Sequence, residues 1–393
     1  MLTRRSIFSM PLAILFLGDL ASAQVLPPGV RMYQNQRYGP HGEGNLLDLY
    51  LPPRSSTPFP VIVWIHGGGW MLGAKEHWPA ICLVDKGFAV ASINYRLTDE
   101  AIYPAQIHDC KAAVRWLRTN AKKLKLDPER IGAWGSSAGG HLAALLGTSS
   151  DVAELEGTQK RSAISSRVQA VCDWCGPTDL EKFSPFQASF PGQPPDCPEQ
   201  IVTKLLGGPV GQRKALTARA NPITYASKKS PPFLIMHGDR DELVPFAQSK
   251  LLEAALREAG AKVEFRAIPG ARHEMFNDSL YAVEDFFRKA LSMPAPKEEP
   301  KLVATYNHRS GDLAAMPVAF YSNGRLLTAD SMHTWRLSGN RLYLCWFNPK
   351  AEPLAVWVDT CVLTKAGYRG VNQDGTGVVG EKVSGDLKER PKA

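Results

Sequence analysis

The stretch of sequence that decides the fold runs from residue 130 to residue 146 and reads RIGAWGSSAGGHLAALL. Residues 130–134 form a short apolar run that predicts a buried strand, and residues 138–146 are rich in Ala and Leu and predict a helix. Between them lies Gly135-Ser136-Ser137-Ala138-Gly139, a G-x-S-x-G pattern centred on Ser137. Small residues permit a sharp turn from strand to helix, which presents a serine hydroxyl at the carboxyl edge of a sheet. This context, more than the pattern itself, makes Ser137 a candidate nucleophile.

Further apolar runs on both sides of this stretch predict the rest of a sheet. They occupy residues 59–66, 88–94, 168–174, 233–237 and 263–268, and their near-continuous apolar character is typical of strands covered on both faces. Helical patterns alternate with them at residues 105–124, 242–259 and 280–291, and residues 127–129 predict a turn. Strands that alternate with helices indicate a doubly wound, mostly parallel α/β sheet. Residues 45–51 alternate Leu with polar residues and predict an antiparallel edge strand.

The chain divides into four predicted parts. Residues 1–23 form a signal peptide and residues 24–291 the α/β domain, within which residues 180–220 fit neither template and are interpreted as a short cap. Residues 292–301 are Pro-rich, charged and without apolar periodicity, which predicts a linker. Residues 302–393 carry turn signals between short aromatic and β-branched runs and predict a small all-β module. Its aromatic residues are interpreted as core, with sugar stacking as the alternative: Tyr306, Tyr321, Trp335, Tyr343, Trp346 and Trp357.

The N-terminus has the pattern of an export signal. Arg4 and Arg5 precede a short apolar segment, and Ala21-Ser22-Ala23 forms a small-x-small cleavage site. The apolar segment is too short to span a membrane, and Sec and twin-arginine export both stay open. We therefore expect an exported protein, periplasmic or extracellular, without a membrane span.

Composition and charge exclude some classes of protein. The chain has 393 residues, 44% hydrophobic and 21% charged, which argues against wholesale disorder. The net charge is 46 − 38 = +8, and the basic residues are scattered, so no nucleic-acid partner is expected.

Seven cysteines are too few for a disulfide scaffold. Cys172 and Cys175 form a C-x-x-C at the end of an apolar run, without the second pair that a zinc site needs, so no metal is expected there. In an exported chain, a disulfide between Cys345 and Cys361 is an open expectation.

A glycine-rich loop follows the predicted strand at residues 59–66. It reads His66-Gly67-Gly68-Gly69-Trp70. Acyl transfer places negative charge on a carbonyl oxygen and needs preorganised donors around it. Glycines let backbone amides approach such an oxygen without a side chain in the way. We predict that the donors are the amides of Gly68 or Gly69 and of Ala138.

A serine nucleophile needs a base, and the base needs an orienting carboxylate. In this strand–turn–helix context the chain order is serine, acid, histidine. His273 lies in a loop after the strand at residues 263–268 and is the predicted base, whereas His237 lies inside a strand, and His308 and His333 belong to the β module. Asp241 is the favoured acid because it lies far enough into its loop to reach His273. The competing carboxylates are Asp239, Asp173 and Asp179.

These motifs resemble the α/β-hydrolase superfamily, and within it exported esterases of the acetyl-xylan and feruloyl esterase-like group, related to the hormone-sensitive-lipase and carboxylesterase families. The resemblance covers residues 45–290 and is carried by the glycine-rich loop, the G-x-S-x-G, the Asp241–Pro245 string and His273-Glu274. It implies that Asp241 is the triad acid and Asp239 structural. It also implies an enzyme without metal or cofactor that acts on short acyl esters.

The sequence therefore predicts a serine hydrolase that cleaves short acyl or aryl carboxylic esters, among them acetyl or feruloyl groups on polysaccharide. A serine peptidase of the prolyl-oligopeptidase type shares the fold and the triad order, although such enzymes normally carry a large propeller domain. A non-catalytic binding protein on a hydrolase scaffold is a third interpretation, but such proteins usually lose a triad member. The acyl specificity, the ligand of the β module and the oligomeric state are not readable from the sequence.

Overall fold

The computed structural model describes residues 29–388, except residues 54, 77–78, 151, 158–162, 184–196, 274–279, 295–300, 323–324, 328–331, 349–354 and 373–374. The predicted signal peptide and most of the predicted linker lie outside the described residues.

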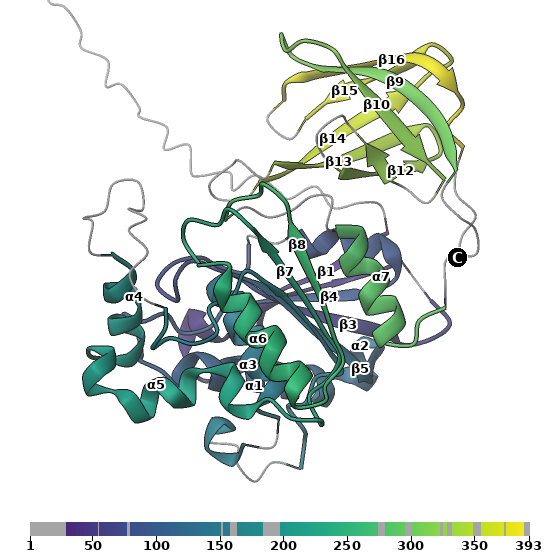
Figure 1. The fold of residues 1–393 in the computed structure, drawn as a ribbon. Helices are drawn as coiled ribbons and strands as arrows, with labels where there is room; N and C mark the ends of the chain where they lie inside the picture. Colours follow the sequence, from purple (N-terminus) through teal and green to yellow (C-terminus); the bar gives the residue numbers. More distant parts are fainter. Residues whose placement is uncertain are drawn as a thin grey trace, which may run out of the picture.

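An eight-stranded, mostly parallel sheet forms the larger part of the molecule (Figure 1). The strand order is β1-β2-β4-β3-β5-β6-β7-β8. Strands β3 to β8 pair in parallel with their neighbours, whereas β2 runs antiparallel to both β1 and β4. The strands are β1 Arg31–Arg37, β2 Leu46–Leu51, β3 Phe59–Ile65, β4 Ala89–Ile93, β5 Leu126–Ser136, β6 Ala170–Trp174, β7 Phe233–Gly238 and β8 Val263–Ile268.

Helices cover both faces of this sheet and bury two apolar layers. Along β3, Val61, Val63 and Ile65 face one layer, and Ile62 and Trp64 face the other, as the two-residue period of a strand requires. The first layer packs against α1, α3 and α6, and the second packs against α7. The helices are α1 Ala105–Thr119, α2 Ala121–Leu124, α3 Ala138–Thr148, α4 Cys197–Leu206, α5 Lys214–Ala220, α6 Ala247–Glu258 and α7 Leu280–Ala290.

The doubly wound α/β class is confirmed, and three local predictions are corrected. Strand β2 is antiparallel as expected but is not the edge, because β1 pairs along its outer side. Strand β1 reads RMYQNQR and is mostly exposed, so it lacks the apolar signal of a strand. The turn expected at residues 127–129 is instead an irregularity within β5, where the register against β3 shifts. The helix expected from residue 105 to residue 124 breaks at Asn120.

The C-terminal region is the expected all-β module, and its strands close into an antiparallel barrel, coloured yellow-green in Figure 1. Strand β9 pairs with both β10 and β16, which closes the barrel and leaves no unpaired edge. The strands are β9 Leu302–Ser310, β10 Met316–Tyr321, β11 Arg325–Leu327, β12 Met332–Ser338, β13 Arg341–Asn348, β14 Ala355–Leu363, β15 Gly367–Val371 and β16 Gly377–Gly385.

The barrel interior is a packed core with its own aromatic residues. Tyr306, Trp335 and Trp346 are buried in it, which supports the packing interpretation for these three side chains. The side chain of Trp357 lies outside the described residues.

The disulfide expected between Cys345 and Cys361 does not form. Cys361 is a buried free thiol. In the β13–β14 ladder Cys345 lies opposite Val358, and Cys361 lies opposite Leu342. This offset of three residues separates the two cysteines by roughly 10 Å along the strands, beyond the ~7 Å that a disulfide can bridge.

Among the described helices, none is both long and apolar enough to cross a membrane.

Candidate active site

Ser137 lies at a sharp turn between β5 and α3. Its backbone has φ 56° and ψ −122°, a conformation that side-chain-bearing residues rarely adopt. The Ser137 amide donates to the carbonyl oxygen of Trp174 at 2.8 Å, which ties the turn to the end of β6. Strain of this kind persists only where the surrounding structure enforces it, and it marks candidate functional positions. The turn therefore has the geometry of a nucleophile elbow.

Gly139 allows the elbow to approach the neighbouring strand. A Cβ at this position would lie 2.0 Å from the carbonyl oxygen of Ile65 and 2.5 Å from that of His66. No real side chain tolerates such distances, so α3 can begin this close to β3 only with glycine here. The packing thus explains the last glycine of the G-x-S-x-G pattern.

The structure brings Ser137, His273 and Asp241 into one hydrogen-bonded line. His273 Nε2 lies 3.0 Å from Ser137 Oγ, and His273 Nδ1 lies 2.7 Å from Asp241 Oδ2. A carboxylate can only accept, so Nδ1 carries the proton and Nε2 accepts from the serine hydroxyl. The three residues come from the loops after β5, β7 and β8, whose carboxyl ends meet at one edge of the sheet.

Asp241 is held by four hydrogen bonds. Its Oδ1 accepts from the amides of Leu243 and Val244, both at 2.8 Å. Its Oδ2 accepts from His273 and from His237 Nε2, the latter at 3.0 Å. Burial alone would raise the pKa of Asp241, but the hydrogen bonds from His237 and His273 outweigh it and lower that pKa well below its usual range. Asp241 is therefore a persistent anion beside His273.

His237 is a supporting residue that the sequence did not single out. It is completely buried, and its Nε2 contacts both Asp241 Oδ2 and the carbonyl oxygen of Val244. Both of these atoms are acceptors, so Nε2 carries the proton, and Nδ1 accepts from Ser249 Oγ at 2.7 Å. Its position within a strand argued against a role as the catalytic base. Only the tertiary contacts show that it holds the predicted acid, Asp241.

The competing carboxylates do not reach His273 in the structure. Asp239 Oδ1 accepts from the Gly270 amide at 2.7 Å, which links the two loops that carry Asp241 and His273. Asp173 is buried and accepts from the Gly176 amide, and burial raises its pKa to about 7. Asp179 accepts from the side chain of Asn221 and from the Glu181 amide.

Of the two remaining histidine candidates, one lies in the barrel and the side chain of the other is not described. His308 donates to or accepts from Tyr368 Oη inside the barrel, at 2.9 Å. The side chain of His333 lies outside the described residues.

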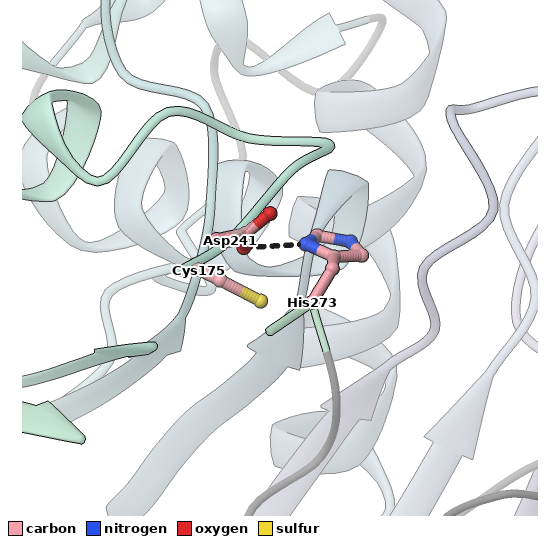
Figure 2. A group of neighbouring side chains, drawn as sticks. All are labelled: Cys175, Asp241 and His273. Atoms are coloured by element: carbon pink, nitrogen blue, oxygen red, sulfur yellow. Dashed lines mark hydrogen bonds and ion pairs between the residues drawn. The ribbon is translucent and has the colours of Figure 1, made fainter. Parts of the chain in front are cut away.

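His273 has a third neighbour, Cys175, at the end of β6 (Figure 2). Burial of the imidazole opposes its protonation, but Cys175 and the Asp241 carboxylate favour it, and the net effect raises the pKa of His273. Cys175 is buried and has a left-handed backbone, with φ 45°. Nothing in the local sequence around Cys175 indicates that it meets these two residues.

The glycine-rich loop packs against the elbow. Gly68 and Gly69 have φ of 101° and 59°, in the left-handed region that favours glycine. Gly69 and Ala138, two of the three predicted oxyanion donors, line a pocket beside Ser137, and Gly68 precedes Gly69 on the loop. The other walls of the pocket are apolar apart from His273: Trp70, Pro177, Phe183, Ile201, Leu243 and Val244. Ile201 comes from α4 in the predicted cap.

Comparison with known proteins agrees with this fold. A model of the BD-FAE family matches residues 47–256. Esterase LipQ of Mycobacterium tuberculosis is 33% identical over 249 residues, which are 60% of this chain and 55% of LipQ. Esterase LipC of the same organism is 30% identical over 251 residues, or 62% of this chain and 60% of LipC.

Solved structures are similar over about two thirds of the chain. A truncated carbohydrate esterase from gut microbiota is 33% identical, with a TM-score of 0.60, and the match covers 67% of this chain and 96% of that one. An acetyl ester-xyloside bifunctional hydrolase from Caldicellulosiruptor lactoaceticus is 26% identical, with a TM-score of 0.53, over 69% of this chain and 97% of that one. The chain spans a little over half the length of the curated relatives it matches. With more than half of its residues matched by the family model, the chain belongs to the BD-FAE family of α/β-hydrolase esterases.

Proposed function

We propose that this chain is a serine carboxylic ester hydrolase that acts on short acyl or aryl esters. The observation that carries the proposal is the line of hydrogen bonds from Ser137 Oγ through His273 to Asp241, with distances of 3.0 and 2.7 Å. This arrangement supplies a nucleophile, a base and an orienting anion in the geometry that acyl transfer requires. The names of the relatives, which are esterases and carboxylic ester hydrolases, support the same reaction class.

In the first half of the reaction, Ser137 Oγ attacks the ester carbonyl carbon and passes its proton to His273 Nε2. The carbonyl oxygen becomes negative and is held by the amides of Gly68 or Gly69 and of Ala138. The bond to the alcohol oxygen then breaks, and that oxygen takes the proton from His273. The products are the free alcohol and an acyl group on Ser137.

In the second half, water attacks the acyl carbon and gives its proton to His273. Ser137 Oγ leaves and takes the proton back, which releases the acid. Asp241 keeps His273 in the tautomer with Nδ1 protonated and stabilises the imidazolium in both halves.

The pocket beside Ser137 supports a small apolar acyl or aryl group. Its lining is apolar apart from Ser137 and His273, and it includes Phe183 and Ile201, the latter from α4. Apolar walls favour binding of the acyl chain, and the few polar groups, Ser137, His273 and the backbone amides, lie where the ester carbonyl would react.

We further propose that the physiological esters are acetyl or feruloyl groups on polysaccharide, met outside the cytoplasm. The N-terminal pattern of Arg4, Arg5 and the Ala21-Ser22-Ala23 site supports export. A carbohydrate esterase and an acetyl ester-xyloside hydrolase are among the similar solved structures.

The activity is tested with p-nitrophenyl esters from acetate to decanoate, using the wild type and Ser137→Ala. We expect turnover of short chains and a loss of roughly 10⁶-fold in kcat in the variant. A fluorophosphonate probe should label the wild type and not Ser137→Ala. Equal hydrolysis by the two proteins would contradict the proposal.

The polysaccharide substrate and export are tested separately. Release of acetate or ferulate from acetylated or feruloylated xylan is the expected result. If xylan stays intact while small esters are cleaved, the polysaccharide proposal fails and the esterase proposal stands. Export predicts that the N-terminal residue of protein recovered outside the cytoplasm is Gln24, which mass spectrometry can determine.

A further inference from the structure

Cys175 adds a third metal-ligating side chain to His273 and Asp241. One ligand atom from each residue lies within 4.8 Å of the other two, and Figure 2 shows the three side chains gathered around one point. Within the part of the chain that the structure describes, this is the one cluster of three such side chains. The mechanism above uses His273 and Asp241 but gives the thiol no role.

We propose that Cys175, Asp241 and His273 form an inhibitory binding site for a thiophilic divalent cation, with Zn²⁺ as the ligand. A thiolate, an imidazole and a carboxylate form a donor set that Zn²⁺ prefers. The proposal that binding inhibits rests on the proposed esterase function, whereas the binding itself does not.

The geometry requires only small movements. Zn²⁺ has bonds of about 2.0–2.3 Å to N, O and S, which places tetrahedral ligand atoms about 3.4–3.6 Å apart. His273 Nδ1 and Asp241 Oδ2 are 2.7 Å apart and would open slightly around the ion. Cys175 Sγ, within 4.8 Å of both, would approach by at most about 1.4 Å.

The backbone holds Cys175 in place for this contact. Its amide donates to the carbonyl oxygen of Met236 at 2.9 Å, and the carbonyl oxygen of Trp174 accepts from the Ser137 amide at 2.8 Å. Both groups belong to the peptide bond that precedes the left-handed Cα of Cys175. The thiol is therefore positioned by the same contacts that build the elbow.

Charge balance also suits a buried site. Binding releases the thiol proton of Cys175 to solvent and shifts the proton of His273 from Nδ1 to Nε2, so that the imidazole stays neutral. The thiolate and the Asp241 carboxylate then neutralise the two positive charges of the ion, which avoids an unpaired buried charge. The side chain of His273 is 17% exposed and lines the pocket beside Ser137, so the proposed site adjoins this pocket.

Occupancy would stop the reaction through His273. With the ion on Nδ1, the neutral imidazole carries its proton on Nε2, and this atom can no longer accept the proton of Ser137. The Asp241 carboxylate would also bind the ion and would lose its hydrogen bond from His273. Neither Ser137 nor a water could then give up its proton.

Binding is tested by titrating the full chain with Cd²⁺ and following the ultraviolet absorption of a cadmium–thiolate bond. We expect one equivalent in the wild type and in Ser137→Ala, which keeps all three ligands. Cys172→Ala is the matched control, because Cys172 is a buried thiol in β6, three residues before Cys175, and is not part of the cluster. Cys175→Ala and Cys175→Ser should lose the signal, and the serine variant retains the size of the side chain.

Inhibition is tested with Zn²⁺ against p-nitrophenyl acetate, each variant being compared with its own activity without metal. Loss of one ligand should raise the inhibitory concentration at least about tenfold, since even outer-shell partners contribute that much. A chelator should restore activity of the wild type.

The site is overturned if Cys175→Ala gives the same Cd²⁺ signal as the wild type, or if Zn²⁺ inhibits both at the same concentration. If the wild type hydrolyses no ester, the proposed function fails, and the Cd²⁺ titration still decides whether the site binds metal.

Discussion

At the scale of single residues, the environment of Asp241 separates it from Asp239, two positions earlier. Asp241 is buried and accepts from two histidines and two amides. Asp239 is exposed and accepts from the Gly270 amide of the neighbouring loop. Asp241 can therefore stabilise a positive charge on His273, whereas Asp239 only links its own loop to the loop of Gly270.

Replacing Asp241 by Asn should lower kcat by about 10⁴-fold. The amide NH₂ group would donate to Nδ1, which moves the imidazole proton to Nε2 and prevents that atom from accepting from Ser137. Asp239→Asn, the matched control, should keep kcat within about tenfold of the wild type, because it changes a loop contact and not the tautomer. The reverse order of the two effects would refute the assignment of the acid.

The pH dependence of kcat/KM should reflect His273. The base works in its neutral form, so activity is present above its pKa and is lost as the pH falls through it. Because the pKa of His273 is raised, the acidic limb should lie above the ordinary value of about 6.5. Asp241→Asn removes the stabilising charge and should move the limb of its residual activity to lower pH. A limb at or below 6.5 in the wild type would contradict this prediction.

At the scale of elements, the elbow depends on the close approach of α3 to β3. Gly139→Ala should reduce the free energy of unfolding by roughly 2 kcal/mol or more, because the new methyl group meets two backbone carbonyls that cannot move aside. Gly211→Ala is the control, since a Cβ there meets nothing within 4 Å. Denaturant unfolding of the two variants measures the difference, and equal stabilities would show that the elbow is not tightly packed.

Helix α4 supplies a wall of the pocket, and this wall should limit the length of the acyl chain. Ile201→Ala should raise kcat/KM for octanoate relative to acetate by about tenfold, because the removed methylenes open apolar space. Val202→Ala is the control, as Val202 is equally buried but does not line the pocket. An unchanged ratio for Ile201→Ala would mean that the acyl chain leaves the pocket by another route.

At the scale of the whole molecule, the sheet and the barrel each have their own strand pairing and their own hydrophobic core. The barrel closes through the pairing of β9 with β16 and has its own buried core, and none of the strands that the structure describes is shared with the eight-stranded sheet. A chain that ends at residue 294 should therefore fold and hydrolyse p-nitrophenyl acetate with kcat/KM within about twofold of the full chain. Circular dichroism and the ester assay test this, and loss of the folded state would show that the barrel stabilises the sheet.

The sequence by itself determined what depends on neighbours along the chain. Buried parallel strands, the Gly135–Gly139 turn and the glycine-rich loop are local patterns, because sterics and burial within a few residues dictate them. Ser137, Asp241 and His273 could be named in the same way, as polar residues that directly follow apolar strands.

Tertiary structure alone decided which of these residues meet. Ser137 and His273 are separated by 136 positions, and their contact depends on the order of β5, β7 and β8 in the sheet. Tertiary structure likewise places His237 and Cys175 beside Asp241 and His273. It also pairs the polar strand β1 with the outer side of β2 and sets the strand register that separates Cys345 from Cys361. These arrangements arise from packing and strand pairing between distant segments, which no pattern within one segment encodes.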